Sequence, residues 1–511
     1  MFEISSVLEG LGIRALNAGA CAGDADSWCP AEGQSAFDAV NPSTGEVTAR
    51  IEDVSAKQVE QIIASAAAKH QRWRIVPPPL RGELVLRIGE LVKEHHTLLG
   101  QLVSIDTGKS VVEGKAEIKE VIDMATMAAG QSRMLYGYTQ QSQRERHRMY
   151  DQWLPLGVVS VISAYNFPAA VWAQNGFLAA IGGNTVVWKP SPKVPLTAIA
   201  LQHLSNRAMK ELGHEGVFSL AIPNENSVAE QLIADPRIAL VSFTGSSEVG
   251  RKVAHLVGQQ LGRRYMLECS GNNGCIVDET ADLKLAARAI TFGVVGTTGQ
   301  RCTSTRRVLV QKGVVQRFTE LLAQSFRQIK VGDPREVDAV VGPLIDKAAV
   351  GHFQEAVAQA VALGGRIVYG GESMDRKGWF VEPTIIAEAQ NDWPCVQHET
   401  FAPIVYVIEY DTLEDAIALH NGVVQGLASG MHSQDISNIE LFLSASGSDC
   451  GIARINMGTT GADVGAAFGG EKETGGGRTA GSDAWKGYMR RQSVCVNWSR
   501  ESPWDKRIVL D

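Results

Sequence analysis

Apolar residues recur at spacings of three and four between residues 56 and 135, the pattern typical of amphipathic helices. The helical segments are AKQVEQIIASAAAKHQRW (56–73), LRGELVLRIGELVKEHHTLLGQLVSIDTG (80–108) and EIKEVIDMATMAAGQSRML (117–135). The polar run that follows, TQQSQRERHRMYDQWLPLG (139–157), is compatible with an exposed strand, with a ribbon between subunits and with a surface loop.

From residue 157 the pattern changes, because short β-branched runs now alternate with helical stretches. The predicted strands are GVVSVIS (157–163), NTVVWKPS (184–191), GVFSLAI (216–222), IALVSFTG (238–245) and RYMLECSG (264–271). Helices are expected between them, over 169–181, 195–212, 227–235 and 247–260. This order predicts a parallel, doubly wound α/β sheet, whose ligands bind at the carboxyl ends of the strands.

A second α/β segment follows, roughly over residues 268–470. It starts with a helix from Asp282 and continues through RRVLVQ (306–311), two long helical runs and APIVYVIEY (402–410). The tail SVCVNWS (493–499) alternates like an exposed strand, and such a strand can pair with another chain. The glycine cluster FGGEKETGGGRTAGS (468–482) is expected to be a mobile loop.

Composition narrows the class of protein. The 511 residues carry a net charge of −8, which argues against a surface for nucleic acid or anionic membranes. No signal peptide and no apolar run of 18 residues is evident, so we expect no membrane span. The eight cysteines are scattered without a CxxC pair or a zinc-type spacing, which fits the reducing cytoplasm and predicts no metal site.

A nucleotide site is indicated only weakly by local strings. The first strand-to-helix turn reads SAYNFPA and lacks a GxGxxG fingerprint. In FTGSSEVG, Gly245 ends a strand and Ser246 lies near the start of a helix, whose free amides can hold a pyrophosphate; a serine cap is also commonplace. Lys189 ends another strand, where it can bridge ribose hydroxyls or simply be exposed.

One thiol stands in a setting that is unusual for a core cysteine. In VGTTGQRCTST (295–305), Cys302 follows Arg301 and a run containing glycines. Reactive thiols need positive charge, backbone donors and access, whereas structural ones have apolar neighbours. The string alone leaves the two interpretations equally open.

Three further strings change that balance. YNFP presents Asn166 at a strand end, LECSGNN presents Glu268 at another, and HETFAP presents Glu399 and Phe401. Together with GQRC, they resemble the aldehyde dehydrogenase superfamily in identity, order and approximate spacing along nearly the whole chain. The resemblance implies a Rossmann-like NAD-binding domain (1–136 and 158–267), a catalytic α/β domain (268–470) and a small β oligomerisation extension (137–157 and 485–511).

The resemblance also implies a role for each residue. Cys302 would attack the aldehyde as a thiolate, and the Asn166 amide with the Cys302 N–H would hold the oxyanion. Hydride would leave to NAD, and Glu268 would then activate the water that hydrolyses the thioester. Lys189, Glu399 and Phe401 would contact NAD. The sequence departs at Pro192, where many relatives have the glutamate that disfavours a 2′-phosphate.

A finer resemblance points to one kind of aldehyde. GNN after Glu268, GSDCGI (447–452), FGGEKETGGGR (468–478) and GSDAWKGYMRR (481–491) are similar to the antiquitin branch, which oxidises α-aminoadipate semialdehyde in lysine breakdown. That branch implies Arg301, Gly461 and Ala462 for the substrate carboxylate and Glu120 for its ammonium. These residues also have plain alternatives. Arg301 can be a second-layer cation, Gly461 and Ala462 can be part of a simple turn, and Glu120 can be a solvated charge on a helix.

Rival functions are a cofactor-independent cysteine hydrolase, a CoA-acylating or phosphorylating aldehyde dehydrogenase and a non-catalytic role. The hydrolase needs a histidine base, which no string pairs with Cys302, and the acylating enzymes commonly lack the glutamate that Glu268 supplies. Other ω-semialdehydes and simple aliphatic aldehydes also stay open as substrates. The family suggests a homo-oligomer, either a dimer or a homotetramer.

Overall fold

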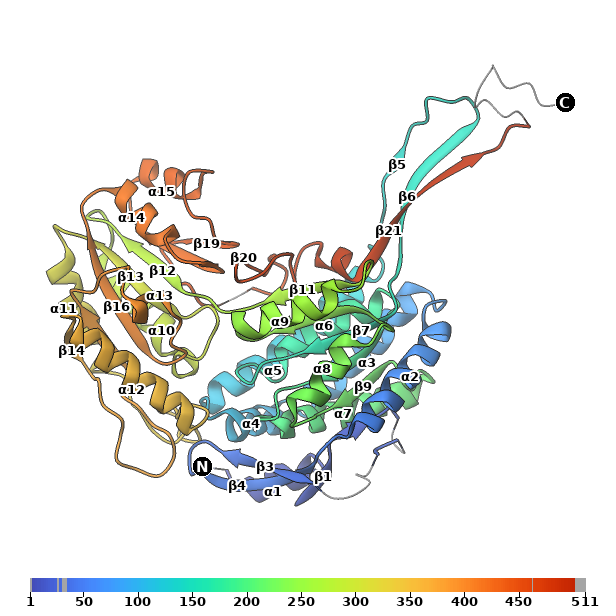
Figure 1. Cartoon of the computed structure of the whole chain (residues 1–511), viewed down its shortest axis with the longest axis horizontal. Coiled ribbons are helices and arrows are strands. Elements are labelled where there is room, and N and C mark those ends of the chain that lie inside the picture. The colour runs from blue at the N-terminus through green and yellow to red at the C-terminus, as the bar shows by residue number, and fades with distance from the viewer. Residues whose placement is uncertain (1, 25–26, 30–34, 462, 501–511) are drawn as a thin grey trace.

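Two sheets with helices packed on them form the body of the molecule, and a narrow β ribbon projects from it (Figure 1). The computed structural model describes residues 2–24, 27–29, 35–461 and 463–500. None of the helices within these ranges combines the length and apolarity that a membrane span needs.

The first sheet has six strands in the order β11-β10-β7-β8-β9-β2. Their bounds are β11 (Arg264–Glu268), β10 (Ile238–Thr244), β7 (Val158–Ile162), β8 (Thr185–Lys189), β9 (Phe218–Ala221) and β2 (Ala20–Cys21). The first five run parallel, which confirms the predicted doubly wound sheet, and all five residues of β7 are buried. Unpredicted β2 adds an antiparallel edge.

Helices surround this sheet much as the periodicity predicts. They are α1 (Ile4–Gly10), α2 (Ala56–Trp73), α3 (Pro78–Glu94), α4 (His96–Thr107), α5 (Val111–Gln131), α6 (Ala170–Ile181), α7 (Pro195–Leu212), α8 (Asn226–Ala234) and α9 (Ser247–Gly258). The segment 80–108, predicted to be helical, forms two helices, α3 and α4. His95 interrupts it, because its φ of −104° and ψ of 13° leave the helical region and its ring nitrogen bonds the Leu91 carbonyl at 2.8 Å.

The second sheet has seven strands in the order β14-β15-β16-β13-β12-β18-β19. They are β14 (Arg366–Tyr369), β15 (Thr384–Ala387), β16 (Ile404–Tyr410), β13 (Thr305–Gln311), β12 (Asn273–Val277), β18 (Ala428–His432) and β19 (Ile452–Ile455). Only the pairing of β14 with β15 is antiparallel. Its helices are α10 (Leu283–Val295), α11 (Val315–Phe326), α12 (Lys347–Ala362), α13 (Pro394–Gln397), α14 (Leu413–Asn421) and α15 (Ile436–Leu443).

Three smaller units complete the fold. A sheet near the N-terminus joins β1 (Leu16–Ala18), β4 (Glu46–Glu52) and β3 (Ala36–Asn41), and β17 (Gln425–Gly426) pairs with β20 (Glu471–Lys472). The projecting ribbon consists of β5 (Thr139–Gln140), β6 (His147–Pro155) and β21 (Met489–Asn497). β6 and β21 pair along nine residues, although 340 positions separate the paired Gln152 and Gln492.

The residues just before β21 belong to the body of the molecule. A short 3-10 helix, η2 (Ala484–Tyr488), places Trp485 and Tyr488 in the hydrophobic core around the first sheet. Trp485 also meets Trp153 of β6 edge to face, with ring centroids 5.3 Å apart. The ribbon is therefore anchored in the core at its base.

Candidate active site

Two cavities, of about 1010 and 770 Å³, meet at three side chains that the sequence analysis singled out. Asn166, Glu268 and Cys302 line both cavities. Asn166 lies in the loop between β7 and α6, Glu268 ends β11, and Cys302 follows α10. The sheet rule explains the first two positions, since strands β7 and β11 end at the same edge.

Cys302 is presented by a sharp turn. After α10 a 3-10 turn, η1 (Gly296–Gly299), gives Thr297, Thr298 and Gly299 φ values of 51°, 55° and 69°. Glycine is required at 299, because a Cβ there would lie 2.5 Å from the backbone of Ala402. The left-handed turn ends helix α10 and changes the direction of the chain, so that the Cys302 thiol lies where the two cavities meet.

The thiol is held in its protonated form at rest. Burial, reinforced by the Glu268 and Glu399 carboxylates, raises the pKa of Cys302 to about 12. Hydrogen bonds from the backbone amides of Cys302 and Thr303 oppose this shift. A base or a local change of charge is therefore needed before the sulfur can attack.

Glu268 has the properties of such a base. Its carboxylate oxygens are buried, and the backbone amide of Gly470 is the donor that lies near them. Burial raises the pKa of Glu268 to about 8, although the nearby Arg478 opposes the shift. A carboxyl group with this pKa exchanges protons near neutral pH, as a general acid–base group does.

The glycine cluster 468–482 lies behind Glu268 and is held in place, contrary to the mobile loop that we expected. Thr474 is fully buried, and its carbonyl accepts from the Cys269 amide at 2.7 Å. The Thr474 hydroxyl donates to the Ser270 carbonyl at 2.8 Å. Composition predicted a loop, but it could not reveal that glycine-rich backbone packs closely against the strand end that carries Glu268.

The second cavity contains every residue predicted to contact a cofactor. Lys189, Gly245, Ser246, Glu399 and Phe401 all line it. Ser246 caps α9 by accepting from the Val249 amide at 3.3 Å, so the amides at the start of that helix face the cavity region. Such a helix start attracts phosphate.

Two buried charged groups in this cavity lack full partners. Burial lowers the pKa of Lys189 to about 8, and its ammonium contacts only the Pro190 carbonyl, at 3.3 Å, among the described residues. Burial raises the pKa of Glu399 to about 7 despite Arg306, 3.5 Å away. An ammonium and a carboxylate left to bind hydroxyls fit the riboses of a dinucleotide. Pro192 also lines this cavity.

The first cavity contains Arg301, Glu120 and Gly461, whereas Ala462 lies outside the described residues. Arg301 donates from Nη2 to Glu113 Oε1 at 2.7 Å, and its guanidinium lies over the rings of Phe167 and Phe292. Its charge is thus already paired with a carboxylate. No local pattern in the sequence indicated Glu113, because 188 positions separate it from Arg301.

Glu120 faces the same cavity from α5. Burial, reinforced by Glu117, raises its pKa to about 7. The side-chain amide of Gln174, on α6, donates to Glu120 Oε1 at 2.5 Å. Gln174 also lines the cavity, and local patterns could not identify it because its partner lies on another helix.

Comparisons with known proteins agree with this geometry. The sequence model described as "Aldehyde dehydrogenase family" matches residues 28–494. A protein of Pisum sativum, "Aldehyde dehydrogenase family 7 member A1", is 43% identical over 91% of this chain and 91% of its own length. The "Alpha-aminoadipic semialdehyde dehydrogenase" of Mus musculus is 41% identical over 90% of this chain and 86% of its own length.

A solved structure shows the same fold. The NAD-dependent aldehyde dehydrogenase of Sinorhizobium meliloti superposes with a TM-score of 0.90 at 28% sequence identity. The match covers 97% of each chain. The similarity therefore extends over both sheets and the cavities between them.

Proposed function

The chain belongs to the aldehyde dehydrogenase family, and on that premise we propose that it oxidises α-aminoadipate semialdehyde with NAD in lysine catabolism. The observation that carries this proposal is the meeting of two cavities at Asn166, Glu268 and Cys302. One cavity has the groups that a dinucleotide needs, and the other is lined by both charged and apolar side chains.

The chemistry follows from the three side chains. Glu268 removes the proton from the Cys302 thiol, whose sulfur then attacks the aldehyde carbon. The Asn166 amide and the Cys302 backbone N–H donate to the oxygen, which becomes negative as the bond forms. Loss of hydride leaves a thioester on Cys302. After Glu268 has released the thiol proton to solvent, it deprotonates the water that hydrolyses the thioester, and the Cys302 thiolate leaves.

The second cavity is proposed for NAD, which when bound accepts the hydride. Ser246 and Gly245 place the start of α9 beside the pyrophosphate, while Lys189 and Glu399 bind ribose hydroxyls. Phe401 provides an apolar wall near the nicotinamide ring. The Phe401 ring packs edge to face on the ring of Tyr165, with centroids 5.9 Å apart. Pro192 provides no carboxylate that would repel the 2′-phosphate of NADP. We therefore expect only a moderate preference for NAD over NADP.

The first cavity is proposed for an amino-acid semialdehyde. Glu120, with Gln174 bonded to it, provides an acceptor for the substrate ammonium. Gly461, which lines this cavity, provides a backbone amide for the carboxylate, and the role of Ala462 stays a prediction from the sequence. Arg301 forms an ion pair with Glu113. We therefore expect it to position the side chains at this end of the first cavity more than to bind the substrate as a free cation.

A substrate and cofactor panel tests the proposal. Initial rates with α-aminoadipate semialdehyde, glutamate semialdehyde, betaine aldehyde and hexanal, each with NAD and NADP, are followed by the absorbance of the reduced nicotinamide. We expect kcat/KM for α-aminoadipate semialdehyde to exceed that for hexanal by at least about tenfold, or ~1.4 kcal/mol. A preference for hexanal contradicts the substrate, and thiol-dependent hydrolysis without reduced cofactor contradicts the dehydrogenase.

We also propose how the chain is organised. Residues 1–136 and 158–267 form the NAD-binding domain, 268–470 the catalytic domain, and 137–157 with 485–511 the extension that joins subunits into a dimer or homotetramer. Within the last range, Trp485 and Tyr488 pack in the core and anchor the extension to the body. The exposed side chains Tyr138 and Trp498 on or beside the ribbon support a contact with another copy. All eight cysteines are free, which supports the cytoplasm as the compartment.

A further inference from the structure

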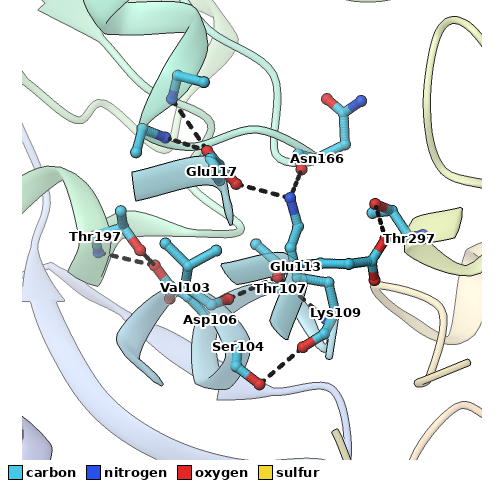
Figure 2. A network of polar contacts seen from close by, with 12 residues as sticks. Val103, Ser104, Asp106, Thr107, Lys109, Glu113, Glu117, Asn166, Thr197 and Thr297 are labelled. Carbon is cyan, nitrogen blue, oxygen red and sulfur yellow. Dashed lines mark hydrogen bonds and ion pairs between the residues drawn. The ribbon is translucent and has the colours of Figure 1, made fainter. Parts of the chain in front are cut away.

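A buried ion pair lies directly beside the loop that carries Asn166 (Figure 2). Lys109 Nζ and Glu117 Oε2 are 2.7 Å apart, and their side chains are only 1% and 0% exposed. Both residues belong to the wall of the first cavity, but so little of either side chain is accessible that a substrate cannot contact their charges. Any effect on the reaction therefore passes through their neighbours.

Those neighbours are the residues around Asn166. The Lys109 ammonium donates to the main-chain carbonyl of Asn166 at 2.6 Å and lies 4.0 Å from the centroid of the Phe167 ring. The second Glu117 oxygen accepts from the backbone amides of Ala169 and Ala170, at 2.8 and 3.1 Å. The pair thus holds the loop on both sides of Asn166 and joins it to the start of α6.

The base of Lys109 is itself fixed. The Ser104 hydroxyl donates to the Lys109 carbonyl at 2.8 Å, and the Lys109 amide donates to the Thr107 hydroxyl at 3.2 Å. Gly108 ends α4 with a φ of 79°, which directs the chain into α5. Lys109 therefore extends from a rigid corner between two helices, as Figure 2 shows.

The same helix also holds the opposite side of the site. Glu113, one turn before Glu117 on α5, accepts from the Thr297 amide at 2.8 Å and from Arg301 at 2.7 Å. Both partners lie in the turn that presents Cys302. One turn of α5, a rise of about 6 Å, therefore separates the anchor of the nucleophile from the anchor of Asn166.

We infer that Lys109 and Glu117 are positioning residues, which hold the Asn166 amide at the place where the oxyanion forms. The inference rests on the proposed function, because it assumes that Asn166 donates to that oxygen. A buried ion pair is often no more stabilising than apolar residues of similar volume, so stability alone does not explain its location. Preorganised donors, in contrast, depend on rigid support.

The test replaces the pair with uncharged side chains of similar size. Lys109→Met combined with Glu117→Gln removes both charges, while the side-chain oxygen of the introduced glutamine can still accept from the amides of α6. We expect kcat to fall by about tenfold to a hundredfold. This is less than the loss that follows when an oxyanion donor itself is removed. KM for the aldehyde and for NAD should stay within about twofold, because neither binding surface changes.

A matched control applies the same two substitutions elsewhere. Lys330 and Glu336 form an exposed ion pair at 2.8 Å, outside both cavities. Lys330→Met combined with Glu336→Gln should leave kcat unchanged. Melting temperatures of both double variants, measured in the same buffer, establish that the folded protein is being assayed. If the first does not fold, Lys109→Arg answers the question, because it leaves no carboxylate buried without a cation but displaces the donor from the Asn166 carbonyl, so kcat should still fall.

The variant Asn166→Ala shows whether the ion pair acts through the Asn166 side chain. If the pair acts through the Asn166 side chain, adding its substitutions to Asn166→Ala should cause almost no further loss of kcat. An equal loss in both backgrounds overturns the inference, as does wild-type kcat in the variant without the ion pair. Wild-type kcat in Asn166→Ala itself instead contradicts the oxyanion role in the proposed function.

Discussion

Cys302 is the residue on which the proposed chemistry depends most directly. Its sulfur forms the only covalent bond to the substrate, so Cys302→Ala should reduce aldehyde oxidation to the background rate. NAD should still bind with unchanged affinity, because most of the second cavity is built by other residues. The rate at which reduced cofactor forms measures aldehyde oxidation, and calorimetric titration with NAD measures the affinity for NAD. Oxidation at the wild-type rate by Cys302→Ala is incompatible with the mechanism.

Glu268 should give the reaction its dependence on pH. Because burial raises its pKa to about 8, the group is mostly protonated at pH 7 and cannot take a proton from water. Deprotonation follows as the pH rises, so the rate of thioester hydrolysis should increase through about pH 8 and level off above it. Turnover measured from pH 6 to pH 9.5 checks this direction.

Glu268→Gln separates the two halves of the reaction. Without the base, turnover should fall by about a hundredfold to ten-thousandfold and lose the pH-dependent rise. Because water is a much weaker acid than the Cys302 thiol, its activation should suffer more, so the thioester should accumulate and be detectable by mass spectrometry of the quenched enzyme. Glu399, whose pKa burial raises to about 7, lines only the second cavity and serves as the comparison. A retained rise near pH 8 in Glu268→Gln would assign that pKa to another group.

At the scale of elements, the packing of α9 on the strand that carries Glu268 sets the position of the proposed phosphate site. Gly250, in α9, allows this contact, since a Cβ there would lie 2.3 Å from Cys269 Sγ. Gly250→Ala should destabilise the fold by about 1–3 kcal/mol and weaken NAD binding, because the helix must shift. Thermal melting and NAD calorimetry measure both effects.

The same helix provides the control. A Cβ on Gly258, at its last position, meets no atom within 4 Å. Gly258→Ala should therefore keep NAD affinity and change stability by at most about 1 kcal/mol, in the stabilising direction. If Gly250→Ala binds NAD as tightly as Gly258→Ala does, the close packing of α9 does not determine the site.

The elements also show what the sequence can and cannot predict. Long periodic segments such as α7 and buried β-branched runs such as β7 were predicted closely, because each carries its own pattern. The two residues of β2 carry no pattern, and its place depends on the edge of β9. Similarly, strings identified Asn166 and Cys302, whereas the contacts of Lys109, Glu113 and Gln174 arise only when distant helices pack.

At the scale of the whole molecule, the ribbon is where we propose that copies of the chain join. Val494 and Val496 are half-buried and alternate along β21, so they share one face of that strand. Replacing both by glutamate should shift the protein to a smaller species, because buried unpaired charge is costly at a contact. Light scattering after size exclusion measures the mass. Ser493→Glu, on the opposite face, is the control, and equal masses for all variants would contradict assembly through this face.

The C-terminal segment has a further consequence for the way the protein is made. Trp485 and Tyr488 fill the core around the first sheet, although they follow the whole second sheet in the chain. The core that emerges first from the ribosome is thus closed by residues that are translated only after the whole second sheet. Until then its apolar faces remain open to chaperones, and we expect a chain that stops just before Trp485 to be degraded although it contains both sheets.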